Sequence, residues 1–201
     1  MSRSLKVPSQ IETVYNCIEN HLKLNLRDVP ISYLNEIEFL RCIKSNINLS
    51  LDVINDIEVI KEIYIEFCRR IPGLYKWRER TVYIKEREKA DMSLLLSELL
   101  HAKSITQGYK QIEDWIREGL PHYLAKILCS KCDISYSKSK HQQYFSLWEK
   151  LNEKYDLYTL STIIYARDIR LTKSILKNIM NYPNDDILEI SFQKAKEIVG
   201  L

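Results

Sequence analysis

Apolar residues recur at helical spacing along most of the chain, whereas extended patterns are short and lie in its N-terminal half. The helical spacing predicts helices at about 8–24, 36–45 and 52–70. Residues 28–34 alternate between apolar and polar types and predict a short strand. Pro30 places this strand at a sheet edge or marks the strand's beginning, because proline cannot donate a hydrogen bond to a neighbouring strand.

Two further extended runs, residues 74–77 and 81–85, flank a short polar segment and predict a β-hairpin. From residue 90 onward the pattern is helical. Helices are expected at about 91–104, 111–129, 139–154, 157–178 and 186–198. This order predicts an α+β fold that is mostly helical, with a small sheet in the N-terminal half and a helical C-terminal part.

The length and composition are those of one ordinary globular domain, with 201 residues, 45% hydrophobic and 28% charged. We expect residues 8–130 to contain the sheet and the central helices, and residues 135–201 to form the C-terminal helices. The net charge of +3 is too small to indicate a nucleic-acid or membrane partner by itself. The apolar stretches are too short to span a bilayer, so no membrane partner is expected.

The chain has five cysteines, and its N-terminus lacks the apolar segment of a secretory signal. An odd cysteine count without a signal favours a reducing interior, the cytoplasm, over a disulfide framework. Cys129 and Cys132 form a CxxC pair, but a structural zinc site needs a second pair of ligands. We interpret them as two cysteines at a helix end, and a redox bridge between them is the alternative.

Residues 93–105 predict a helix that is apolar around most of its circumference and therefore buried on most sides. Ser97, Glu98 and His101 nevertheless share one stripe of this helix, since positions three and four apart are neighbours. A buried glutamate is costly unless it is protonated, paired or close to a metal ion. This stripe is therefore the candidate functional site.

Two segments carry a recognisable pattern around this stripe. The first is Ser97-Glu98-Leu99-Leu100-His101, and the second is Trp115-Ile116-Arg117-Glu118-Gly119-Leu120-Pro121-His122-Tyr123-Leu124. Together they resemble the gluzincin-type zinc peptidases. In these enzymes two histidines four residues apart bind Zn²⁺, the glutamate after the first is the general base, and a second helix supplies a glutamate ligand. The resemblance extends over about residues 8–180.

The resemblance implies a zincin-like fold in which His101 and Glu118 bind zinc and Glu98 is the general base of peptide hydrolysis. Ser97 stands where these peptidases have their first histidine. Zinc should therefore be weakly held or absent, and the protein inactive or weakly active as a hydrolase. His122 lies one helical turn after Glu118 and is the replacement ligand if the protein is an active zinc-dependent peptidase. The alternative is that His122 only hydrogen-bonds Ser97 or solvent.

The resemblance also implies a strand for substrate and a donor for the oxyanion. The edge hairpin of these peptidases pairs with an extended peptide or protein segment. This assigns substrate binding to Thr81, Val82, Tyr83 and Ile84. A tyrosine or histidine stabilises the oxyanion, and the candidates in the corresponding region are Tyr136, His141 and Tyr144.

A rival interpretation is a nucleic-acid- or peptide-binding module that uses the basic hairpin region 69–89. Basic residues are interleaved there with Tyr75, Trp77 and Tyr83, a combination that suits phosphates and bases. The acidic residues among them are equally typical of a solvated edge strand. Steep salt dependence of oligonucleotide binding would favour nucleic acid, whereas a peptide bound without cleavage would favour a peptide-binding module.

Overall fold

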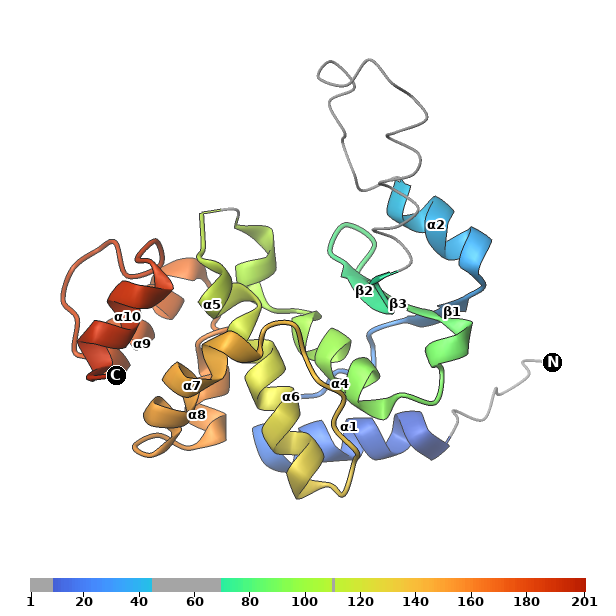
Figure 1. The fold of residues 1–201 in the computed structure, drawn as a ribbon, viewed down its shortest axis with the longest axis horizontal. Coiled ribbons are helices and arrows are strands. Elements are labelled where there is room, and N and C mark those ends of the chain that lie inside the picture. The colour runs from blue at the N-terminus through green and yellow to red at the C-terminus, as the bar shows by residue number, and fades with distance from the viewer. Residues whose placement is uncertain (1–8, 45–69, 110) are drawn as a thin grey trace, which may run out of the picture.

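The computed structural model describes residues 9–44, 70–109 and 111–201 (Figure 1). Its helices are α1 (Ser9–Leu22), α2 (Glu36–Lys44), α4 (Met92–His101), α5 (Asp114–Arg117), α6 (Gly119–Lys131), α7 (Phe145–Asn152), α8 (Leu157–Thr162), α9 (Ile169–Met180) and α10 (Phe192–Val199). Its strands are β1 (Ile31–Leu34), β2 (Gly73–Lys76) and β3 (Thr81–Lys85). Short 3₁₀ turns are η2 (Glu86–Glu88), η3 (Ile105–Gly108) and η4 (Gln142–Tyr144). The helix predicted at 52–70 lies almost entirely outside the described residues.

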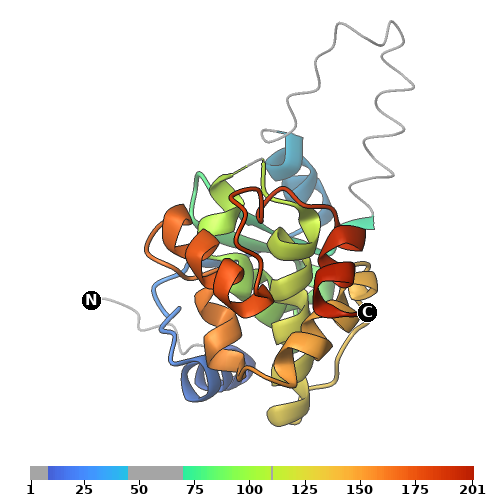
Figure 2. The same cartoon turned by 90° about the vertical axis from the view of Figure 1, so that its left-hand side faces the viewer.

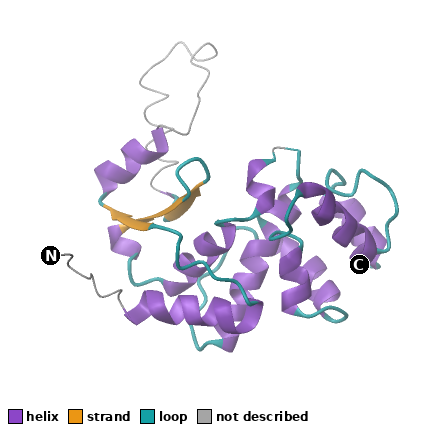
Figure 3. Ribbon diagram, turned by 180° about the vertical axis from the view of Figure 1, so that it is seen from behind, coloured by secondary structure: helices purple, strands orange, loops and turns teal. Residues whose placement is uncertain are grey.

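The strands form one sheet, drawn in orange in Figure 3. Their order in the sheet is β1-β3-β2. β3 pairs in parallel with β1, in a register that sets Ile31 opposite Val82. It pairs antiparallel with β2, in a register that sets Gly73 opposite Ile84. β3 is therefore the central strand, and β1 and β2 are its edges. β1 begins directly after Pro30, as the sequence predicts.

The two faces of the sheet contact different helices. Val82 and Ile84 belong to the main hydrophobic core, which includes α4, whereas Tyr83 packs against Phe39 and Ile43 of α2. Successive side chains of a strand point to opposite faces, so this alternation places α2 on one face of the sheet and α4 on the other. α4 thus connects the sheet to the helical remainder of the molecule.

The main core extends from α1 through α4 and α6 to the C-terminal helices. Along α1 the apolar positions predicted from the sequence are buried. Figure 2 views the molecule from the side of the C-terminal helices, which lie in front of the central ones. The observed elements confirm the predicted α+β class, mostly helical with a small sheet.

Several of the predicted long helices are shorter or interrupted. The prediction at 111–129 corresponds to α5 and α6, and that at 157–178 to α8 and α9. Asp168 lies within the helix predicted at 157–178, directly before α9. Its side chain accepts hydrogen bonds from the N–H groups of Arg170 and Leu171. A side chain that accepts these bonds begins a new helix. The predictions at 139–154 and 186–198 were too long at their N-terminal ends, because α7 begins at Phe145 and α10 at Phe192.

The cysteines are arranged differently from the prediction. Cys17 of α1 and Cys132 after α6 form a disulfide, with Cα atoms 6.1 Å apart and a sequence separation of 115. Cys129 is a buried free thiol inside the core. Cys129 and Cys132 lie at the C-terminal end of α6, as the sequence predicts. The alternative of a redox bridge between them is wrong, because Cys132 pairs with Cys17, and so is the expectation of a chain without disulfides. The packing of α1 beside α6 brings Cys17 to Cys132.

Removal of this disulfide is expected to lower the free energy of unfolding by about 2–4 kcal/mol, because a bridge across a long loop restricts the unfolded chain. The double variant Cys17→Ser/Cys132→Ser tests this by guanidinium unfolding without leaving a thiol that pairs with Cys129. Cys42→Ser, at a half-buried cysteine of α2 that takes no part in this bridge, is the control. Five free thiols in the native protein, counted by mass spectrometry after alkylation, would contradict the bridge.

Candidate functional site

The candidate site begins on α4, which carries the predicted stripe. Asp91 caps this helix, and its side chain accepts a hydrogen bond from the N–H of Leu94. The leucines on the other side of the helix are fully buried in the main core and fix its rotation. Ser97, Glu98 and His101 consequently line a cavity.

Glu118 occupies the junction between α5 and α6. α5 ends at Arg117, and α6 begins at Gly119. Pro121, in the first turn of α6, has no N–H to donate to the carbonyl group of Arg117, four residues earlier, so the helical hydrogen-bond ladder is interrupted here. The N–H of His122 donates to the carbonyl oxygen of Glu118 at 3.3 Å. Glu118 and His122 are therefore one turn apart and face the same cavity.

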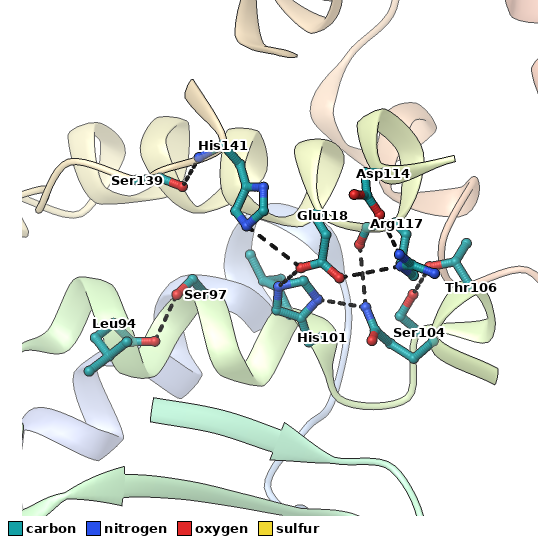
Figure 4. A network of polar contacts seen from close by, with 12 residues as sticks. Leu94, Ser97, His101, Ser104, Thr106, Asp114, Arg117, Glu118, Ser139 and His141 are labelled. Carbon is teal, nitrogen blue, oxygen red and sulfur yellow. Dashed lines mark hydrogen bonds and ion pairs between the residues drawn. The ribbon is translucent and has the colours of Figure 1, made fainter. Parts of the chain in front are cut away.

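His101, Glu118 and His122 converge from α4 and the start of α6. Nε2 of His101 lies 3.6 Å from Oε2 of Glu118 (Figure 4), and one ligand atom from each of the three residues lies within 4.8 Å of the others. Zinc bonds of about 2.0–2.1 Å place tetrahedral ligand atoms about 3.4 Å apart. Small side-chain movements therefore suffice for all three atoms to reach one metal ion. The predicted approach of His101 to Glu118 is confirmed.

His141 adjoins this cluster from the segment before η4. Its Nε2 lies 4.0 Å from Oε2 of Glu118 (Figure 4), and its ring stacks on that of His122 with centroids 4.8 Å apart. Tyr136 also lines the cavity. Tyr144 does not; it packs on the backbone of Gly119, where an added Cβ would lie only 2.8 Å from the Cβ of the tyrosine. Of the three oxyanion candidates, Tyr136 and His141 therefore border the site.

Burial keeps the imidazoles neutral. It lowers the pKa of His101, although the negative charge of Glu118 opposes the shift. Burial, together with repulsion from His101 and His141, lowers the pKa of His122 to about 2. Burial also lowers the pKa of His141. Neutral imidazole is the form that binds metal ions, so no histidine has to lose a charge first.

Glu98 faces the same cavity, beside β2. A Cβ added at Gly73 would lie 3.4 Å from the Cγ atom of Glu98, so the strand passes close to this side chain. Burial, and then the negative charge of Glu118, raise the pKa of Glu98 from 4.5 to about 8. The carboxyl group is therefore largely protonated at neutral pH in the metal-free protein. A carboxyl group with such a shift, placed in a cleft, is a typical general acid or base.

The cavity has a volume of about 450 Å³ and lies between β2, α4 and the segment 136–141. The strand that borders it is β2, whereas β3 is covered by β1 and β2 along its two edges. A strand paired along both edges cannot add a peptide strand, so the predicted assignment of the substrate strand to β3 is corrected; the strand that borders the cavity is β2. The cavity lining includes none of the four residues predicted to bind substrate, which are Thr81, Val82, Tyr83 and Ile84.

Ser97 occupies the position that would hold a first histidine. It is buried, and its hydroxyl group donates to the carbonyl oxygen of Leu94 at 2.9 Å (Figure 4). Its proton is thus committed within the helix rather than to His122. Gln107 belongs to no motif of the sequence, yet its Nε2 lies 2.8 Å from Nδ1 of His101.

The hairpin region does not form a uniform cationic face. Lys76 and Lys85 are buried, and they pair with Glu79 and Glu36 respectively. Trp77, at the turn, is 58% exposed. A surface that follows a nucleic-acid backbone needs several cations open to phosphates, so the burial of two of them weakens the nucleic-acid interpretation.

Comparison with protein-family models, curated proteins and solved structures finds no match. Among the described residues, no helix has both the length and the apolar character needed to cross a membrane. The function must therefore be inferred from the residues of the cavity themselves.

Proposed function

We propose that the chain is a zincin-like, metallopeptidase-like protein whose zinc site, incomplete at Ser97, holds the metal weakly and supports at most slow peptide hydrolysis. The ligands are His101, Glu118 and His122. The observation that carries the proposal is the convergence of these three ligand atoms within 4.8 Å, in a cavity that also contains Glu98.

The donor set suits zinc, because imidazole nitrogen and carboxylate oxygen are its usual ligands in catalytic sites with three protein ligands. A zinc ion bound there supplies Lewis-acid chemistry, which polarises a carbonyl group and acidifies water. The order of the ligands differs from that of the peptidases that the sequence resembles, since His122 takes the place of a histidine at position 97. This difference is the reason for expecting weak binding.

The other residues of the cavity have roles that their positions suggest. Glu98 would accept the proton of the attacking water, for which it must first be ionised. Burial raises the pKa of Tyr136 to about 12, so its hydroxyl group stays protonated and is a donor for the developing oxyanion. The edge strand β2 would bind an extended peptide by strand addition. Lys138 and Lys140 line the opposite wall, which favours acidic or neutral peptide segments.

The test is the metal content and zinc affinity of protein purified without chelators or a metal-affinity tag, combined with a fluorogenic peptide assay. His122→Ala is expected to release the metal, whereas Glu98→Gln should keep the metal and abolish any hydrolysis. His21→Ala is the matched control, because His21 is the remaining histidine of the chain and lies in the last turn of α1.

Two outcomes would contradict the proposal. Tight stoichiometric zinc with fast hydrolysis that survives His122→Ala would show that His122 is not a ligand. Failure of zinc, cobalt and manganese to bind the wild-type protein at millimolar concentration would show that the three side chains do not form a metal site.

A further inference from the structure

Gln107 of η3 contacts the predicted metal ligand His101 from the side opposite Glu118. The amide nitrogen Nε2 of Gln107 lies 2.8 Å from Nδ1 of His101. The other imidazole nitrogen, Nε2, is the one that faces Glu118. A metal ion shared with Glu118 would therefore have to bind Nε2 of His101.

The orientation of the Gln107 amide follows from its second neighbour. Its Nε2 also donates to the carbonyl oxygen of Arg117 at 3.3 Å. This carbonyl group is open because Pro121, four residues later, has no N–H to offer it. With the amide reversed, Oε1 would face the carbonyl oxygen, and two acceptors would oppose each other. The two N–H bonds of the amide are thus directed at Arg117 and at Nδ1 of His101.

This arrangement determines which nitrogen of His101 carries the proton. A neutral imidazole has one N–H and one lone pair. Since Nδ1 accepts a hydrogen bond from Gln107, the proton resides on Nε2. We propose that Gln107 holds the proton of His101 on Nε2, the nitrogen that faces Glu118, and so opposes metal binding at this site. The consequence for the metal rests on the proposed function, but the proton placement does not.

Metal-binding histidines usually donate their second N–H to an oxygen acceptor, which orients the ring and strengthens the ligand. Gln107 presents the opposite polarity to His101. For Nε2 to become a ligand, the proton must move from Nε2 to Nδ1 through solvent. The Gln107 amide must also rotate so that Oε1 accepts the new N–H, and the carbonyl group of Arg117 then loses its donor. Gln107 thereby weakens the site independently of Ser97.

The proton placement is measured on the metal-free protein at pH 7.5 by long-range ¹H–¹⁵N correlation spectra of ¹⁵N-histidine-labelled samples. The His101 signals are identified by their loss in His101→Phe. We expect Nδ1 without a proton and Nε2 with one in the wild type. In Gln107→Glu the carboxylate accepts a hydrogen bond, so we expect the reverse. Protonated Nδ1 in the wild type would overturn the proposal.

The effect on metal is measured with the same variants by competition for zinc against a chelating dye. Gln107→Glu is expected to tighten binding at least about tenfold, which is the usual scale for partners of a ligand. Gln107→Leu, which offers neither donor nor acceptor, should tighten it less; equal affinities of the two variants would contradict a role of the acceptor. If no variant binds zinc although the proton positions are as expected, the zinc site falls and the proton placement stands. If the wild type binds zinc tightly and its metal-free form carries the His101 proton on Nδ1, the proton placement falls and the zinc site stands.

Discussion

Replacement of Ser97 by histidine is expected to tighten zinc binding on the order of a hundredfold, and at least about tenfold. Ser97 lies one turn before His101 on α4 and lines the same cavity. A histidine introduced there would form with His101 the pair that binds zinc from one helical face. The free energy with which structural sites of four ligands bind zinc is about 10–16 kcal/mol, which is about 3 kcal/mol for each ligand. Each 1.4 kcal/mol corresponds to about a factor of ten.

The double variant Ser97→His/His122→Ala makes this test specific. In the wild-type background, His122→Ala is expected to release the metal, because only His101 and Glu118 remain. With the introduced histidine present, the same substitution should leave zinc bound. Ser97→Ala is the control and should not change affinity, since the serine hydroxyl group is bonded to the carbonyl oxygen of Leu94 rather than to the cluster.

The measurement is competition with a chelating dye, accompanied by circular dichroism to verify folding. No gain in affinity for a folded Ser97→His protein would mean that α4 and α6 are not spaced so that a histidine pair on α4 can share one metal ion with Glu118. The cluster would then differ from the zinc site of the peptidases that the sequence resembles at more than its first ligand.

The sequence predicted those features of the fold that depend on short-range patterns. The buried side of α1 and the strand that begins after Pro30 follow directly from the spacing of apolar residues and the missing proline N–H. The approach of His101 to Glu118 was expected from the resemblance to zinc peptidases, and the geometry agrees with it.

Features that depend on long-range packing were not accessible in this way. A hairpin pattern predicts that β2 and β3 pair, but it does not reveal that β1 covers the other edge of β3. The strand that borders the cavity was therefore predicted wrongly. The disulfide joins cysteines 115 residues apart, and no local signal connects them.

Gln107 shows how a site residue escapes a search by motif. It lies in a 3₁₀ turn that has no characteristic spacing relative to His101. The single sequence signal was indirect, because Pro121 leaves the carbonyl group of Arg117 in need of a donor. Which side chain satisfies that need is decided by the packing of η3 against α5, which only the structure gives.

The second large effect concerns Glu98 and the stability of the metal-free protein. Glu98→Gln is expected to stabilise the protein at pH 8 by about 4 kcal/mol relative to the wild type, and by little at pH 5. The pKa of Glu98 is raised from 4.5 to about 8 by burial and by the charge of Glu118. Glutamine keeps the shape of the protonated side chain and never ionises.

The sign follows from the protons bound in the two states. Below about pH 4.5 Glu98 is protonated both in the folded and in the unfolded protein, and its contribution to stability is fully present. As the pH rises toward 8, the unfolded chain releases this proton while the folded protein retains it. The free energy of unfolding then falls by about 1.4 kcal/mol per pH unit, until the folded protein also ionises. Most of the loss therefore occurs between pH 5 and 8.

Urea unfolding of chelator-treated wild type, Glu98→Gln and Glu189→Gln at pH 5, 6.5 and 8 measures the effect. Glu189 is exposed, so its variant should follow the wild type at every pH. Contributions of the other carboxyl groups are common to all three proteins and cancel in the differences. If the free energies of unfolding of wild type and Glu98→Gln change with pH in parallel from pH 5 to 8, Glu98 ionises normally in the folded protein.

Addition of zinc supplies a further test, because a nearby cation favours the ionised carboxylate. Zinc should then reduce the difference between wild type and Glu98→Gln at pH 8, and the same change would convert Glu98 from a protonated acid into the base that hydrolysis requires.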